Sequence, residues 1–268
     1  MSQSLAHIRA IVFDLEDILF DRADWLLPAV EHAAQLANHD GQRALGLATD
    51  YIKQRGSADA GLYNHILLGL GQSDSVLNIK AFIDRINSYR ATPGSLNLLP
   101  GIKDALQELR KYYKIGIVSV GVHEIQRNKV AVLGLSELVN DVTIEEDKPG
   151  LRRVPVLHRA LQASVSRLSE RAGFTLFVAD NPFKDFQAAR RLGMMSVRVL
   201  TGEYSEVEYP SLDHTADYDI SSVARVPELM KLQPEARTRV MSAEEVDGSV
   251  MSILDSIKDH KHSLSIGN

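Results

Sequence analysis

The sequence predicts an α/β protein: a doubly wound parallel β-sheet that is interrupted early by a block of helices. Short apolar, β-branched runs alternate with helical stretches from residue 114 onward, a pattern typical of a doubly wound sheet. A further strand-like run, IRAIVF at 8–13, stands by itself near the N-terminus. The long stretch 24–87 has helical composition and no strand-like alternation, so we expect it to be an insertion into the sheet domain.

The first predicted strand is the run at 8–13. It is short, rich in β-branched residues and followed by an acidic cluster, as expected of a strand buried on both faces of a parallel sheet. The helical stretch after it is broken by turn-forming residues at three places: 39–41, 56–57 and 69–73. A loop at 91–95 ends the stretch, and the Pro-Gly pair at 100–101 opens a helix at 102–111.

The remaining elements alternate in chain order. Strands are expected at 115–119, 138–144, 175–179, 196–200 and 218–220. Helices are expected at 123–133, 155–168 and 183–192. A last surface helix is expected at 243–260, before a frayed tail.

Composition excludes several classes of protein. Of the 268 residues, 44% are hydrophobic, which is enough for a sizeable core and excludes wholesale disorder. The net charge of −5 argues against a nucleic-acid binder, and the absence of Cys excludes disulfides, a thiol nucleophile and a cysteine zinc site. No run approaches the roughly 18–20 apolar residues of a membrane span, and the N-terminal apolar run is too short for a signal peptide. We therefore expect a soluble cytoplasmic protein without nucleic-acid or membrane partners, as a monomer or homodimer.

A polar residue stands at or just after the end of four of the predicted strands. In chain order the residues at these ends are Asp14, Glu16 and Asp17; Ser119, followed by Val120 and Gly121; Lys148; and Asp180 and Asp185. The carboxyl ends of parallel strands meet at one edge of a sheet, where ligands of open α/β sheets bind. We therefore expect these residues to share one site.

The chemistry of this set is that of a phosphate site. Converging carboxylates repel one another and need a cation, and all-oxygen ligands suit Mg²⁺ when phosphate is the substrate. A hydroxyl, backbone N–H groups of a glycine-containing turn and one Lys can hold a phosphoryl group, while a carboxylate can attack phosphorus. Each residue taken singly has a simpler explanation: Ser119 could cap a helix, Asp180 could open a turn before Asn181, and Lys148 could lie in a surface loop.

Together these residues resemble the four motifs of the haloacid dehalogenase (HAD) superfamily. The segment FDLEDILF at 13–20 resembles motif I, and GIVSVG at 116–121, with Gln126 and Lys129 downstream, resembles motif II. The tripeptide DKP at 147–149 resembles motif III. The segment FVADNPFKDF at 177–186 resembles motif IV and is the most specific of the four matches.

The resemblance implies a Rossmann-like core with an inserted α-helical cap that closes over small substrates. The implied core comprises 1–21 and 98–235, and the implied cap comprises 22–97. The segment 236–268 would form a C-terminal helix and tail.

The resemblance also implies a role for each site residue. Asp14 would be the nucleophile and a metal ligand, and Glu16 the general acid/base, with its backbone carbonyl facing the metal. Ser119 and Lys148 would hold the phosphoryl oxygens, helped by backbone N–H groups at Val120 and Gly121. Asp180 and Asp185 would complete the Mg²⁺ site.

One departure from the family pattern bears on activity: Glu16 stands where phosphatases of the family carry Asp.

The leading hypothesis is a Mg²⁺-dependent hydrolase that removes phosphate from a small phosphorylated metabolite through an aspartyl-phosphate on Asp14. A second is a catalytically weak HAD-fold protein with a binding or assembly role, which Glu16 motivates. A phosphotransferase or mutase of the same superfamily is a third, because the same intermediate supports it.

Overall fold

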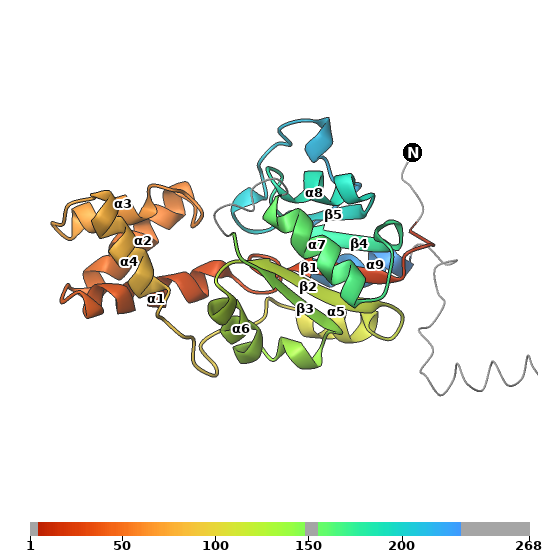
Figure 1. Ribbon diagram of the computed structural model, residues 1–268, viewed down its shortest axis with the longest axis horizontal. Helices are drawn as coiled ribbons and strands as arrows, with labels where there is room; N and C mark the ends of the chain where they lie inside the picture. The colour runs from red at the N-terminus through yellow and green to blue at the C-terminus, as the bar shows by residue number, and fades with distance from the viewer. Residues whose placement is uncertain (1–4, 148–154, 232–268) are drawn as a thin grey trace, which may run out of the picture.

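The computed structural model describes residues 5–147 and 155–231. Within these ranges six parallel strands form one sheet, in the order β3-β2-β1-β4-β5-β6 (Figure 1). The strands are β1 (Ala10–Asp14), β2 (Lys114–Val120), β3 (Asp141–Glu145), β4 (Thr175–Ala179), β5 (Met195–Val199) and β6 (Tyr218–Ile220). The predicted doubly wound α/β fold is confirmed.

Strand β1 lies at the centre of the sheet because its side chains are apolar on both faces. Alternate residues of a strand point to opposite faces. Ile11 and Phe13 accordingly enter one apolar core, and Ala10 and Val12 enter the other. Strands β2 and β4 flank β1, so the strand order reverses there and a crevice is expected beyond the carboxyl end of β1.

A layer of helices covers each face of the sheet. The helices that share the core of Ile11 and Phe13 are α5 (Ile102–Leu109), α6 (His123–Val132) and α9 (Val226–Lys231). Those that share the core of Ala10 and Val12 are α7 (Val156–Arg167) and α8 (Asp185–Leu192). Short 3-10 turns join the larger elements: η1 (Leu135–Glu137), η2 (Ala172–Phe174), η3 (Gly202–Tyr204), η4 (Leu212–His214) and η5 (Val223–Arg225).

Four helices form a separate bundle beside the sheet, between β1 and α5 in sequence (Figure 1). They are α1 (Arg22–Leu36), α2 (Gly41–Arg55), α3 (Leu62–Gly69) and α4 (Val76–Ile86), hereafter the α1–α4 bundle. Asp21 and Asp40 begin α1 and α2 by accepting hydrogen bonds from the backbone N–H groups of Ala23 and Arg43. The breaks predicted from the sequence fall in the connections between these helices, so the helical insertion is confirmed.

The third predicted strand begins later than expected, at Asp141 instead of residue 138. The side chain of Asn140 accepts a hydrogen bond from the backbone N–H of Ile115 at 2.8 Å, so regular pairing with β2 starts only after it. The predicted helix at 243–260 and tail lie outside the described residues. No helix in the described ranges is long and apolar enough to cross a membrane.

Candidate active site

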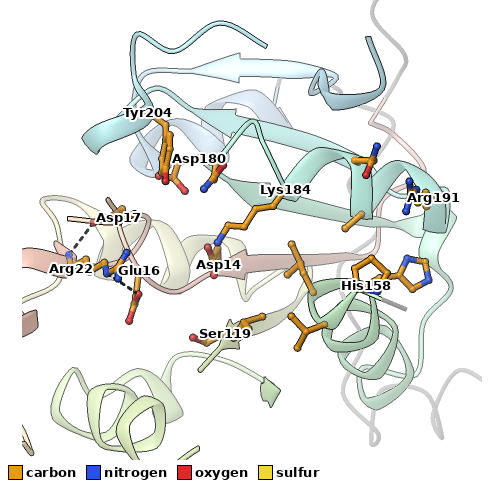
Figure 2. A pocket seen from close by; sticks show the side chains of 18 residues that line it. Asp14, Glu16, Asp17, Arg22, Ser119, His158, Asp180, Lys184, Arg191 and Tyr204 are labelled. Atoms are coloured by element: carbon orange, nitrogen blue, oxygen red, sulfur yellow. Dashed lines mark hydrogen bonds and ion pairs between the residues drawn. The ribbon is translucent and has the colours of Figure 1, made fainter. Parts of the chain in front are cut away.

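The predicted site residues within the described ranges gather at the carboxyl edge of the sheet, around the end of β1 (Figure 2). Six of them line a cavity of about 340 Å³. The predicted residues among its walls are Asp14, Glu16, Asp17, Ser119, Val120 and Asp180. Asp185, the first residue of α8, stands beside them, and Lys148 lies outside the described residues.

Three carboxylates converge at the centre of this edge. Asp14, Asp180 and Asp185, hereafter the carboxylate triad, each offer an oxygen within 4.8 Å of the other two. Asp180 Oδ2 and Asp185 Oδ1 are buried, and within the described part of the chain neither has a hydrogen-bond partner. Buried oxygen atoms without partners, all from carboxylates, fit a hard divalent cation such as Mg²⁺.

The raised pKa values of the triad also indicate a cation site. Burial raises the pKa of Asp14 to about 7, and the Asp185 charge adds to the increase while Lys184 lowers it. Burial also raises the pKa of Asp180 to about 8, with further contributions from Asp185 and Asp14. Burial raises the pKa of Asp185 as well. Three acids that resist ionisation together need a cation before all three can be charged.

Lys184 also lines the cavity, although it is not among the residues predicted from the sequence. Its side chain reaches from the start of α8 toward Asp14 (Figure 2), and its Nζ lies 3.9 Å from Asp185 Oδ1. The charge of Asp185 is the main reason that the pKa of Lys184 is raised. Its position within the motif IV segment, between two acids, is the signal by which it could have been found.

Glu16 is held by a cluster of basic and amide groups. Lys129 Nζ forms an ion pair with Glu16 Oε1, Gln126 Nε2 donates to the same oxygen at 3.2 Å, and Arg22 Nε lies 3.6 Å from Oε2. Burial alone would raise the pKa of Glu16, but Lys129 and Arg22 outweigh it and hold the pKa at about 2. Glu16 is therefore an ionised carboxylate at neutral pH.

Lys129 connects this cluster to the α1–α4 bundle. Its side chain is only 2% exposed, and its Nζ lies 3.9 Å from the centre of the Trp25 ring on α1. An ammonium group over an indole face is attracted by the ring electrons. Lys129 thus stabilises Glu16 and a helix of the bundle at once.

Ser119 lies within β2 and Gly121 directly follows the strand, and the two residues have different surroundings. Ser119 is buried and lines the cavity, as expected of a phosphate-binding hydroxyl. The backbone N–H of Gly121 donates to the carbonyl oxygen of Glu145 at 3.0 Å. This N–H therefore does not point into the cavity, which differs from the prediction. The glycine makes room for Gln126, whose Nε2 would lie 2.6 Å from a Cβ at position 121.

Comparison with known proteins agrees with this geometry. A family model described as haloacid dehalogenase-like hydrolase matches residues 11–199, which is most of the chain. The chain belongs to this family. The motif resemblance seen in the sequence is therefore confirmed, and the carboxylate triad lies at the sheet edge where that resemblance expected the site.

Curated relatives in the family carry one name, glyceraldehyde 3-phosphate phosphatase. The relative from Methanocaldococcus jannaschii is 27% identical over 235 residues, covering 84% of this chain and 97% of its own. The relative from Pyrococcus furiosus is 25% identical over 247 residues, covering 89% and 100%.

Solved structures share the fold at low sequence identity. A predicted phosphoglycolate phosphatase from Haemophilus somnus has a TM-score of 0.60 at 16% identity, covering 83% of this chain and 98% of its own. A putative HAD-hydrolase from Bacillus subtilis, solved with bound magnesium, has a TM-score of 0.57 at 15% identity, with the same coverage of both chains. At these identities the structures support the fold alone.

Proposed function

We propose that this protein is a Mg²⁺-dependent phosphohydrolase that removes phosphate from a small phosphorylated metabolite. The observation that carries the proposal is the carboxylate triad, which combines a half-buried nucleophile candidate, Asp14, with a cation site. The names of the curated relatives support the phosphatase class, and the cavity of about 340 Å³ suits a small substrate. Glyceraldehyde 3-phosphate is the first substrate to test.

We assign the covalent step to Asp14. One of its carboxylate oxygens attacks phosphorus, a bond from Asp14 to phosphorus forms, and the bond from phosphorus to the ester oxygen of the substrate breaks. Water then attacks the aspartyl-phosphate, which releases phosphate and restores the carboxylate. Ser119, and Lys148 by the family resemblance, hold the phosphoryl oxygens.

The carboxylate triad and the backbone carbonyl of Glu16 would hold Mg²⁺. When bound, the ion neutralises charge on the triad and on the phosphoryl oxygens, so that an anionic nucleophile can meet an anionic substrate. Lys184 adds a second positive charge beside Asp14.

We assign the proton transfers to Glu16. Its ionised carboxylate is ready to take a proton from the attacking water in the second step. In the first step it must take up a proton before it can protonate the leaving oxygen. The negative charge of a bound phosphate group favours that uptake, because a like charge nearby raises a carboxyl pKa.

We propose that the α1–α4 bundle is the cap over this site, with the domain boundaries expected from the sequence: 22–97 for the cap, and 1–21 with 98–235 for the core. Ala58 of the bundle lines the cavity together with the core residues, which supports a role in enclosing the substrate. A cover of this kind excludes water from the reacting groups.

Phosphate release tests the proposal directly. Purified protein is incubated with glyceraldehyde 3-phosphate, other sugar phosphates and an aryl phosphate, with Mg²⁺ or with EDTA. We expect Mg²⁺-dependent release, fastest from the smallest sugar phosphates because of the cavity volume. Absence of release from every compound, with Mg²⁺ bound and the protein folded, would contradict the proposed activity.

The second candidate function, a catalytically weak binding protein, rests on Glu16. If Glu16 transfers protons, Glu16→Gln should lower kcat by about 10²–10⁴-fold, and Glu16→Asp should retain most of the activity because it keeps a carboxyl group. Glu228→Gln, which changes an exposed carboxylate on α9, is the control and should leave kcat and KM unchanged. A large gain of activity in Glu16→Asp alone would instead favour the second candidate.

A further inference from the structure

The carboxylate of Glu203, in the sheet domain, contacts the α2–α3 connection of the α1–α4 bundle. Its Oε1 accepts a hydrogen bond from the backbone N–H of Ser57, and its Oε2 accepts one from the N–H of Ala58 at 3.3 Å. The partners are 146 and 145 positions apart in the chain. Hydrogen bonds to an ionised acceptor are stronger than those between neutral groups, so the two contacts tie the connection firmly.

We propose that Glu203 is a positioning residue for substrate selection: it holds the Ser57–Ala58 segment against the cavity and so sets the size of substrate that enters. The inference rests on the proposed phosphohydrolase function for its substrate, but the contact itself does not depend on that function.

The turn that carries Glu203 is anchored to the site. Glu203 lies in η3, whose next residue, Tyr204, lines the cavity. Just before the turn, Thr201 Oγ1 donates to the backbone carbonyl of Asp17 at 3.4 Å, close to the end of β1. A shift of this turn therefore moves a cavity wall as well as the contact to the bundle.

The segment held by Glu203 also forms part of the cavity. Ala58 lines it, and Asp59 stiffens the connection by accepting hydrogen bonds from the Tyr51 hydroxyl at 2.6 Å and from the Gly61 N–H at 2.8 Å. Because the connection is held together internally, fixing Ser57 and Ala58 fixes the wall that the substrate meets.

Gly56 shows that the local backbone is shaped for this contact. Its φ of +87° lies in the region that favours glycine, and a Cβ at this position would lie 2.7 Å from Glu203 Oε2. Any side chain here would push the carboxylate away from the two N–H groups. Glu203→Ala and Gly56→Ala thus break the same contact from opposite sides.

The test combines a structural and a kinetic measurement on the full-length protein. Hydrogen–deuterium exchange follows the amides of Ser57 and Ala58 in wild type, Glu203→Ala and Glu206→Ala, the last being an exposed carboxylate that follows the same turn. We expect exchange at both amides to rise by about tenfold or more in Glu203→Ala, as for the loss of a charge-assisted hydrogen bond, and to stay unchanged in Glu206→Ala.

In the kinetic measurement, KM and kcat are compared for a three-carbon and a six-carbon sugar phosphate. We expect Glu203→Ala to raise KM for the three-carbon substrate by about tenfold with little change in kcat, and to reduce the preference between the two substrates. A uniform fall in kcat for both substrates, with their ratio unchanged, would overturn the proposal by indicating a merely structural role.

The exchange result separates failure of this inference from failure of the proposed function. If wild type releases no phosphate but the two amides lose protection in Glu203→Ala, the contact stands and the assigned activity is wrong. If the amides exchange at the wild-type rate, the inference is overturned whatever the activity. If Glu203→Ala does not fold, the same exchange and kinetic measurements are made on Glu203→Asp, whose side chain is one methylene shorter, and the same outcomes apply.

Discussion

Asp14→Asn is expected to abolish phosphate release, with kcat lower by about 10⁴-fold or more, as for the loss of other enzyme nucleophiles. The amide has nearly the shape of the carboxylate but cannot attack phosphorus. Asp14 is the last residue of β1 and lines the cavity beside Asp180 and Asp185, so no neighbouring carboxylate can take its place without moving the strand. Steady-state phosphate release with saturating Mg²⁺ measures the loss.

Asp24→Asn is a matched control for this variant. Asp24 is exposed on the first turn of α1, outside the cavity, so the same change of chemistry there should leave kcat unchanged. Activity of Asp14→Asn within a few-fold of wild type would show that the reaction does not pass through an aspartyl-phosphate at Asp14.

The second large effect is a dependence of stability on pH that Mg²⁺ reverses. In the metal-free protein the pKa of Asp180 is about 8 and that of Asp14 about 7, both above the ordinary value of 3.8. The folded state therefore binds these protons more tightly than the unfolded chain. The stability they contribute is complete below about pH 4 and is lost as the pH rises through 7 and 8.

Thermal unfolding in EDTA should accordingly show a Tm that falls by several degrees between pH 6 and pH 8. The low pKa of Glu16, about 2, has the opposite sign but acts only below about pH 4.5, outside this window. At pH 8, Mg²⁺ at 100 times its Kd should restore about 2.7 kcal/mol, because the ion binds the folded state.

Asp180→Asn provides the control for this titration. Asparagine does not titrate, so the variant should lose the part of the pH slope in EDTA that comes from Asp180, between pH 7 and pH 8, and keep the part from Asp14 near pH 7. It should also lose most of the stabilisation by Mg²⁺. A wild-type Tm that is flat between pH 6 and pH 8 in EDTA would contradict the placement of three mutually repelling carboxylates in one buried site.

The acids of the site could be predicted from the sequence because their positions follow from local patterns. A short, apolar, β-branched run bounded by polar residues, such as that of β1, is typical of a strand buried in a parallel sheet, and such a sheet brings the carboxyl ends of its strands to one edge. Asp14 and Asp180 stand directly at two such ends, so their meeting required no knowledge of side-chain packing. The helical insertion was predictable in the same way, from composition and its turn-forming breaks.

The partners of those acids could not be predicted in this way. Whether Glu16 faces solvent or Lys129, 113 positions away, depends on how α6 packs against the end of β1. The same is true of the Gly121 N–H, which pairs with Glu145 instead of facing the cavity, and of Glu203, which reaches the bundle 146 positions back. Hydrogen bonds and ion pairs depend on distances of a few ångströms between elements far apart in sequence.

Local sequence patterns therefore predict the sheet, the inserted helices and the residues of the carboxylate triad, because periodicity and strand ends are local properties. Three further features follow from the folded arrangement alone: the low pKa of Glu16, the position of Lys184 beside Asp14 and the contact between Glu203 and the bundle. Those features arise from burial and from the approach of distant side chains, which no local pattern encodes.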